Sequence, residues 1–333
     1  MKIVITGGAG FLGQKLARRL LQRGEIAVSD DGAGRFIDEI VLVDQVEPPE
    51  MDGDPRVVAV AADIADRAVM GELVGADTDL VFHLAAVVSG AAEADFDLGM
   101  RVNLDASRQL LEICRAAGNR PRVVFTSSVA VYGGVTGGVD DATAMRPRSS
   151  YGAQKAIGEL LLGDYHRRGF VDGRILRLPT ISVRPGAPNK AASSFASGLI
   201  REPLNGVGAV CPVPLDLKLW LLSPRRAIEA IIKGAELPSQ ALGDERAVNL
   251  PGLSVTVGEM IAALERVGGR QAVDRITHQP DPAVEAIVGS WPAAWDVGRA
   301  TALGLEGDAD FDSVIRAYVE DERPGVGLAV AAS

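Results

Sequence analysis

The sequence predicts a doubly wound α/β fold, in which helices cover both faces of a parallel β-sheet. Short apolar runs rich in β-branched residues recur through the first half of the chain, as expected of strands buried on both faces. Segments of helical periodicity separate these runs, and such alternation favours right-handed crossovers between parallel strands. The predicted strands are residues 3–5, 40–43, 57–61, 80–84, 123–125 and 175–178.

Three segments between the strands have the spacing of helices. Leucine recurs every four residues over 12–20, and Gly24 supplies a stop after this segment. Residues 100–117 and 151–168 are predicted as two further helices.

The regular alternation ends near residue 178, after which prolines interrupt the pattern repeatedly. We therefore predict a sheet domain over residues 1–178 and a smaller, less regular region over residues 179–333. We expect the smaller region to bind substrate and to return in part to the sheet. Further helices are expected at 191–201 and 223–235, and surface loops at 29–38 and 133–138.

The charge balance gives no indication of a nucleic-acid partner. The 34 basic and 44 acidic residues leave a formal net charge of −10 at pH 7. The densest basic clusters are single pairs, such as Arg18 with Arg19. A nucleic-acid-binding protein usually carries a basic surplus or a basic stripe.

Cysteine usage and hydropathy favour a cytoplasmic protein without a metal site. Cys114 and Cys211 cannot form a disulfide framework, and neither belongs to a CxxC pair, so we expect a reducing compartment and no structural zinc. No run approaches the roughly 18 apolar residues that a membrane span requires, so we expect no membrane partner. The first predicted strand begins at residue 3, which leaves no room for a signal peptide.

A glycine-rich stretch, TGGAGFLG at residues 6–13, joins the first predicted strand to the first predicted helix. This is the position of a dinucleotide-binding fingerprint in a Rossmann fold. The glycines permit a tight turn and the close approach of a diphosphate to the helix N-terminus. The alternative is a glycine turn without a ligand. The candidate cofactor-binding residues here are Gly7, Gly10, Phe11, Leu12 and Gly13.

An acidic residue at the end of the second predicted strand indicates which dinucleotide is bound. Asp44 follows Val43 directly, and a carboxylate there accepts hydrogen bonds from the adenosine ribose and repels a 2′-phosphate. No arginine follows Asp44 closely, so NAD is favoured over NADP. The alternative is an ordinary turn aspartate.

A tyrosine and a lysine four residues apart indicate general-base chemistry. Tyr151 and Lys155 share one face of a predicted helix, so both can point into one cleft. A nearby ammonium group stabilises phenolate, and we expect it to lower the pKa of Tyr151 toward the working pH. Ser127 and Ser128, at the end of the preceding strand, could supply a hydroxyl to the reacting oxygen. The alternative is that the tyrosine and the lysine lie on a solvated helix face.

Together these features resemble the extended short-chain dehydrogenase/reductase family, which includes NAD-dependent epimerases and dehydratases of nucleotide sugars. The resemblance spans nearly the whole chain and implies a Rossmann-type fold. The motifs that carry it are TGGAGFLG, Asp63-Ile64, His83-Leu84-Ala85-Ala86, Val102-Asn103, SSVAVYG at residues 127–133, and the Tyr151/Lys155 pair.

The resemblance also implies a role for each matching residue. Asp63 and Ile64 would contact adenine, Leu84, Ala85 and Ala86 would lie under the phosphates and ribose, and Asn103, Ser127 and Pro179 would complete the cofactor site. Ser128, with Ser127 as the close alternative, would orient the reacting oxygen, Tyr151 would be the acid/base, and Lys155 would bind the nicotinamide ribose. A homodimer is implied, with helices 100–117 and 151–168 pairing with their symmetry mates.

The substrate indicated is a small sugar acid. Many nucleotide-sugar members carry Asn where this chain has Thr180, which is a candidate substrate-binding residue. Arg184 and Lys190 offer cations for a carboxylate, with Ser89 as a further candidate. Both cations could instead be surface charges. Residues 83–96 and 177–195 resemble family members that oxidise the C2 hydroxyl of a four-carbon sugar acid with NAD. The alternatives are a nucleotide-sugar epimerase or dehydratase that recycles NAD, and a cofactor-binding regulatory protein without catalysis.

Overall fold

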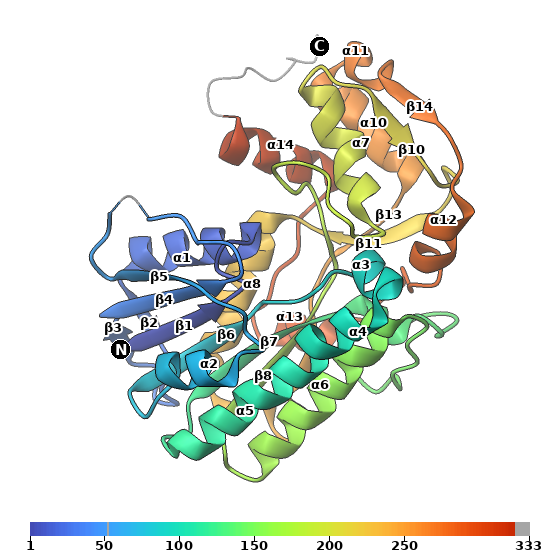
Figure 1. The fold of residues 1–333 in the computed structure, drawn as a ribbon. Coiled ribbons are helices and arrows are strands. Elements are labelled where there is room, and N and C mark those ends of the chain that lie inside the picture. The colour runs from blue at the N-terminus through green and yellow to red at the C-terminus, as the bar shows by residue number, and fades with distance from the viewer. Residues whose placement is uncertain (52, 324–333) are drawn as a thin grey trace.

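The computed structural model, which describes residues 1–51 and 53–323, is built on a seven-stranded sheet (Figure 1). All neighbouring strands in this sheet run parallel. From one edge to the other, the strands are β12 (Ala247–Asn249), β8 (Asp172–Leu178), β7 (Arg122–Ser128), β6 (Thr78–His83), β1 (Lys2–Thr6), β4 (Glu39–Asp44) and β5 (Val57–Ala61). The six predicted strands all lie in it.

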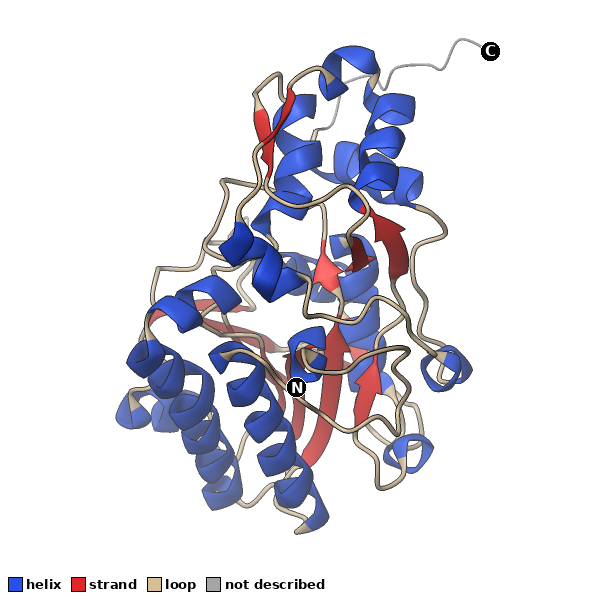
Figure 2. Cartoon of the chain, turned by 90° about the vertical axis from the view of Figure 1, so that its right-hand side faces the viewer, coloured by secondary structure: helices blue, strands red, loops and turns tan. Residues whose placement is uncertain are grey.

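Helices cover both faces of the sheet, as Figure 2 shows. Because side chains alternate along a strand, Ile3 and Ile5 pack into one apolar core and Val4 into another on the opposite face. The first core is closed by α1 (Phe11–Arg23) and α8 (Pro224–Glu236), the second by α2 (Arg67–Leu73), α5 (Ala106–Ala117) and α6 (Ser150–Arg167). The predicted doubly wound α/β fold is therefore confirmed.

The predicted helix over residues 100–117 has a different geometry from the one expected. It begins with α4 (Phe96–Gly99), continues as a π-helical segment, η1 (Met100–Asp105), and becomes α5 only at Ala106. Within η1, the Asn103 carbonyl oxygen accepts a hydrogen bond from Ser107 Oγ (2.7 Å). Single π-turns of this kind occur often beside functional sites, and apolar spacing does not reveal them.

One predicted surface loop, residues 29–38, contains a strand. Its residues form β3 (Gly34–Phe36), which pairs antiparallel with β2 (Glu25–Ala27). All three residues of β3 are exposed, so its sequence lacks the apolar pattern by which strands are predicted. The other predicted loop, residues 133–138, contains no helix or strand and follows a short 3₁₀ turn, η2 (Val129–Tyr132).

The C-terminal part has a smaller core of its own beyond the carboxyl ends of the strands. Its strands are β9 (Thr180–Ile181), β11 (Lys218–Leu222) and β13 (Leu253–Thr256) in one sheet, and β10 (Ala209–Cys211) with β14 (Ile276–His278) in another. Its helices include α7 (Ser194–Leu204), α10 (Val257–Gly268), α11 (Arg270–Val273), α12 (Pro282–Val288) and α14 (Phe311–Glu322). By contrast, α8 and β12 return to the large sheet, near α9 (Ser239–Leu242) and α13 (Gly298–Ala302).

Within residues 1–51 and 53–323, no helix combines the length and the apolar character needed to cross a membrane.

A buried carboxylate ties three parts of the sheet together at the end opposite the cleft described below. Asp172, at the start of β8, pairs with Arg122 (2.8 Å), Arg246 (3.1 Å) and Arg174, all of which are buried. Burial favours its protonated form, but the guanidinium groups of Arg174 and Arg122 outweigh burial and lower the pKa of Asp172 to about 2. One carboxylate thus compensates several guanidinium charges.

We expect Asp172→Asn to lower the free energy of unfolding by about 3–5 kcal/mol, because it leaves buried guanidinium groups without their anion. Urea unfolding at neutral pH measures this value. Since the pKa of Asp172 is lowered on folding, its contribution is present above about pH 4 and is lost as the pH falls toward 2. Asp164→Asn, which breaks an exposed pair with Arg167, is the control and should cost less than about 1 kcal/mol. Equal losses for both variants would contradict the assignment.

Candidate active site

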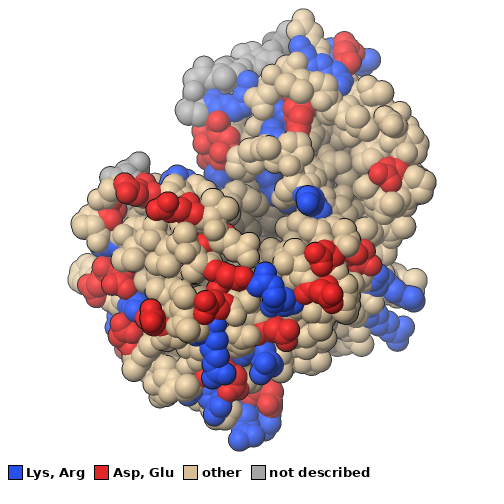
Figure 3. Space-filling view, viewed as in Figure 1, with Lys and Arg blue, Asp and Glu red and all other residues tan. Residues whose placement is uncertain are grey.

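A cleft of about 530 Å³ lies at the carboxyl ends of the parallel strands, where ligands bind in open α/β sheets. Figure 3 shows the molecule hollowed between the sheet and the smaller C-terminal part. Most of the predicted site residues line this cleft: Gly7, Gly10, Phe11, Leu12, Gly13, Asp44, Ile64, Leu84, Ala85, Ala86, Ser89, Ser127, Ser128, Tyr151, Lys155, Pro179, Thr180 and Arg184. Asp63, Asn103 and Lys190 do not line it.

The glycine loop forms a cradle that side chains would fill. The N–H groups of Gly7 and Gly8 both donate to the Val43 carbonyl oxygen (2.9 and 3.0 Å), which turns the chain sharply after β1. Gly7 has a φ of +77°, and a Cβ there would lie 2.9 Å from the Ala85 nitrogen. The N-terminus of α1, capped by Gly10 without a side-chain hydrogen bond, opens on this cradle. These features fit a dinucleotide diphosphate.

Asp44 lies at the end of β4, beside the glycine loop. Its Oδ2 accepts a hydrogen bond from the Ala9 N–H (3.1 Å), and the residue lines the cleft. A carboxylate in this position can accept hydrogen bonds from the ribose hydroxyls of a dinucleotide and repels a 2′-phosphate.

Two predicted cofactor residues, Asp63 and Asn103, do not line the cleft. Asp63 pairs with Arg101 (2.5 Å) and accepts from the Ala65 N–H (2.9 Å), so its neighbour Ile64 lines the cleft instead. Asn103 is buried, and its amide bonds both the N–H and the carbonyl of Val87 (2.7 and 3.0 Å). Asn103 therefore shapes the wall, because its side chain is occupied by the backbone of that wall.

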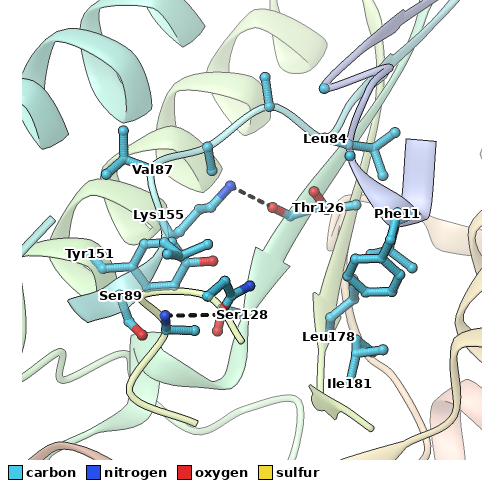
Figure 4. A pocket seen from close by; sticks show the side chains of 18 of the residues that line it. Phe11, Leu84, Val87, Ser89, Thr126, Ser128, Tyr151, Lys155, Leu178 and Ile181 are labelled. Atoms are coloured by element: carbon cyan, nitrogen blue, oxygen red, sulfur yellow. Dashed lines mark hydrogen bonds between the residues drawn. The ribbon is translucent and has the colours of Figure 1, made fainter. Parts of the chain in front are cut away.

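Tyr151 and Lys155 enter the cleft from the first turns of α6. Ser149 caps this helix by accepting from the Gly152 N–H (3.1 Å). Lys155 Nζ donates to the Thr126 carbonyl oxygen (2.8 Å) and lies 5.8 Å from the centre of the Tyr151 ring. Figure 4 shows Tyr151, Lys155 and Ser128 gathered around one part of the cleft.

The structure distinguishes the two serines that the sequence left open. Ser127 Oγ donates to Glu159, a buried carboxylate that also pairs with Arg177 (2.6 Å). The Ser128 hydroxyl instead accepts from the Ala130 N–H (3.2 Å), lines the cleft, and acts to lower the pKa of Tyr151. The geometry therefore favours Ser128 as the serine that meets a reacting oxygen.

Burial dominates the electrostatics of the tyrosine and the lysine. It raises the pKa of Tyr151 to about 12, opposed by the hydrogen bond with Ser128 and the charge of Arg184. It lowers the pKa of Lys155 to about 8, opposed by the charge of Glu159. The expectation that Lys155 brings the pKa of Tyr151 below its usual value is therefore wrong for this structure, in which Ser128 and Arg184 are the groups that lower it.

Of the two predicted substrate cations, only Arg184 reaches the cleft. Its Nη2 is buried and has no hydrogen-bond partner among the described residues. Burial, followed by the charge of Arg201, lowers the pKa of Arg184 to about 10. Lys190 is exposed and lies outside the cleft.

Polar residues that the sequence did not single out also line the cleft. Asn189 and Ser193 lie on the segment that follows Arg184, and Ser89 Oγ accepts from the Ala192 N–H of this segment (3.2 Å). They form a polar wall suited to the hydroxyls of a substrate. Asn189 and Ser193 are single polar residues in the sequence NKAAS, so no sequence pattern indicated this wall.

Residues 3–221 match the NAD dependent epimerase/dehydratase family, and the chain belongs to this family. The D-erythronate dehydrogenase of Cupriavidus necator is 63% identical to this chain, covering 96% of it and 98% of the relative. The D-erythronate dehydrogenase of Haemophilus influenzae is 46% identical, with 96% and 99% covered. A solved structure of a nucleoside-diphosphate-sugar epimerase from Agrobacterium tumefaciens superposes with a TM-score of 0.91 at 43% identity, covering 98% of this chain and 95% of that one.

These relationships confirm the predicted family and the predicted NAD cofactor. They also confirm the resemblance to a sugar-acid dehydrogenase, since D-erythronate is a four-carbon sugar acid.

We expect Asp44→Ala to weaken the preference for NAD over NADP. The variant loses hydrogen bonds to the ribose, worth about 1.5–3 kcal/mol for a charged acceptor, and it no longer repels a 2′-phosphate. The ratio of kcat/KM values for the two cofactors measures the change. An unchanged ratio would show that Asp44 does not meet the adenosine ribose.

We expect Ser128→Ala to move the rising limb of the pH–rate profile to higher pH. Oxidation through a general base requires the phenolate, and the Ser128 hydroxyl lowers the pKa of Tyr151. Without it the pKa rises, and less phenolate is present at any given pH. Between about pH 6 and about pH 10 the rate still rises with pH, so the shift is measured as a lower initial rate of the variant at each pH. A limb that stays in place would show that Ser128 does not influence the base.

Proposed function

We propose that this chain oxidises the C2 hydroxyl of D-erythronate to the 2-oxo acid, 2-oxo-tetronate, with NAD. One observation carries the proposal: Arg184 lines the same cleft as Tyr151, and its Nη2 is buried without a hydrogen-bond partner among the described residues. An arginine with an unused donor at the wall of a cleft favours a carboxylate ligand. The names of the two D-erythronate dehydrogenases support this substrate.

The arrangement accounts for the choice of C2. Arg184 is near enough to Tyr151 for its charge to lower the pKa of the phenol, so a carboxylate bound by Arg184 would bring the neighbouring carbon, C2, toward Tyr151. Ser128 hydrogen-bonds the C2 hydroxyl and Tyr151 removes its proton, while Lys155 holds the end of β7 through Thr126. NAD, when bound, supplies the acceptor for the hydrogen that leaves C2 with its electron pair. The glycine cradle and Asp44 would hold this cofactor.

The pKa of about 12 keeps Tyr151 protonated at neutral pH, and this value already includes the lowering by Ser128 and Arg184. The proposed proton transfer therefore requires that the phenolate be stabilised further when cofactor and substrate bind.

A second candidate is a nucleotide-sugar epimerase, favoured by the epimerase from Agrobacterium tumefaciens. Such an enzyme reduces again what it has oxidised, so it releases no net NADH. The two candidates therefore differ in the number of NADH molecules that they release per substrate molecule converted.

Absorbance at 340 nm during incubation with NAD and either D-erythronate or a UDP-sugar decides between them. We expect many NADH equivalents per enzyme from D-erythronate and none from the UDP-sugar. Tyr151→Phe is the control and should lower the rate by about a hundredfold or more. Epimerisation of the UDP-sugar without NADH release, together with inert D-erythronate, would overturn the proposal.

We expect Arg184→Met to raise the KM for D-erythronate by about ten- to a hundredfold, because it removes a charge-assisted contact. A smaller fall in kcat at neutral pH follows from the loss of a charge that lowers the pKa of Tyr151. The KM for NAD should not change. Lys190→Met, which removes an exposed cation outside the cleft, is the control and should behave like the unmodified enzyme. Identical KM values for both variants would exclude Arg184 as the carboxylate ligand.

We also propose a homodimer formed through α5 and α6. Ile157 and Leu160 support it, because both are exposed on α6, Leu160 with 65% of its surface accessible. A two-fold axis would bring these apolar side chains against their own copies. We expect a dimer mass by light scattering at micromolar protein and a monomer mass for Leu160→Glu. A monomer in the unmodified protein would contradict the proposal.

We propose a cytoplasmic location. Its support is the state of the two cysteines, Cys114 and Cys211, which are both free and buried. Free cysteines are typical of reducing compartments.

A further inference from the structure

Helix α7 holds the backbone of Arg184 at two points. Ser197 Oγ accepts a hydrogen bond from the Arg184 N–H (3.0 Å), and Arg201 Nη1 donates to the Arg184 carbonyl oxygen (2.7 Å). Ser197 and Arg201 are four residues apart, so they lie on the same face of the helix. The backbone N–H and the backbone carbonyl oxygen of Arg184 are thus both bound by side chains of α7.

A third hydrogen bond joins the same two segments. Ser182 Oγ donates to the Ala196 carbonyl oxygen (3.1 Å). Ser182, Ser197 and Arg201 are all buried. Buried hydrogen bonds are costly to lose, because the remaining partner is left without water.

Neither Ser197 nor Arg201 lines the cleft, so neither can contact the substrate directly. Arg201 is also compensated: its Nη2 donates to Glu202 Oε1 (2.5 Å). The charge of Arg201 is thereby balanced, and its other nitrogen binds the Arg184 carbonyl. This differs from Arg184 itself, whose Nη2 has no partner among the described residues.

The two sides of the site are anchored in different cores. Ala196, Leu199 and Ile200 fix α7 in the smaller C-terminal core. Tyr151 stands on α6, which packs against the large sheet. The position of the guanidinium relative to the phenol therefore depends on what fastens residue 184 to α7.

We infer that Ser197 and Arg201 are positioning residues that fix Arg184 for the substrate carboxylate, so that α7 sets the affinity for the acid. The inference rests on the proposed function, in which Arg184 binds that carboxylate. A long side chain on a fixed backbone loses less conformational freedom when it binds, and this favours tight binding. Loss of the hydrogen bond with Ser197 or of the one with Arg201 should therefore weaken binding of the acid. Proton transfer to Tyr151, measured by kcat, should not change.

Ser197→Ala tests the hydrogen bond between Ser197 Oγ and the Arg184 N–H. We expect the KM for D-erythronate to rise about three- to tenfold, with kcat and the KM for NAD within about twofold of normal. Arg316→Met is the control. It removes an exposed arginine from α14, a helix that packs in the same C-terminal core as α7. Thermal unfolding of both variants shows whether the fold is retained.

A double-mutant cycle separates positioning from a general structural effect. In the Arg184→Met background, Ser197→Ala should leave the KM for D-erythronate unchanged, because the group it positions is gone. The same proportional rise in both backgrounds would overturn the inference.

The test of Arg201 needs a second substitution, since loss of Arg201 alone leaves the partly buried Glu202 without a cation. Arg201→Met with Glu202→Gln removes both charges, and we expect a rise in KM similar to that of Ser197→Ala. Arg201→Lys keeps a donor for the Arg184 carbonyl and should restore most of the affinity. No rise in KM for the paired substitution would overturn the role of Arg201.

The outcomes also separate this inference from the proposed function. If Arg184→Met leaves the KM unchanged, Arg184 is not the carboxylate ligand, and the proposed function fails at that point. If Arg184→Met raises the KM but Ser197→Ala and the Arg201 variant do not, only the positioning role of α7 fails.

Discussion

The hydrogen bond from Lys155 Nζ to the Thr126 carbonyl oxygen (2.8 Å) fastens helix α6 to the end of strand β7, and the site depends on it. Gly152 permits the close approach, because a Cβ there would overlap the Ala130 carbonyl oxygen. At this separation, Tyr151 and the hydroxyl-bearing end of β7 reach one part of the cleft. The same closeness buries Lys155 and partly buries Tyr151, and their pKa values move in opposite directions.

The residues that line the cleft come from two parts of the molecule, each with its own apolar core. The large sheet provides the glycine cradle, Asp44 and Tyr151, which in the proposed function bind the cofactor and take up the proton. The smaller part provides Arg184, which is suited to recognise an acid. In the proposed function, the Arg184 guanidinium group binds the acid end of the substrate.

Local patterns predicted the fold and the cofactor end of the site, because a glycine loop and a four-residue spacing are fixed by neighbouring residues. The choice between Ser127 and Ser128 was not local, since it depends on Glu159, a buried carboxylate on another element. The difference between Arg184 and Lys190 likewise depends on how α7 packs. The direction of the pKa shift of Tyr151 was mispredicted, because burial outweighs any effect of Lys155. Asn103 was placed in the cofactor site, yet its amide is taken by the backbone of Val87.

The fate of deuterium tests the central claim most directly, because the claim is that C2 of a sugar acid is the carbon oxidised. D-erythronate labelled with deuterium at C2 should transfer the label to the NADH produced, whereas the same acid labelled at C3 should keep it in the 2-oxo acid. Mass spectrometry of both products measures the distribution. Label arriving in NADH from C3 would contradict the account, because a carboxylate held by Arg184 would then not bring C2 to Tyr151.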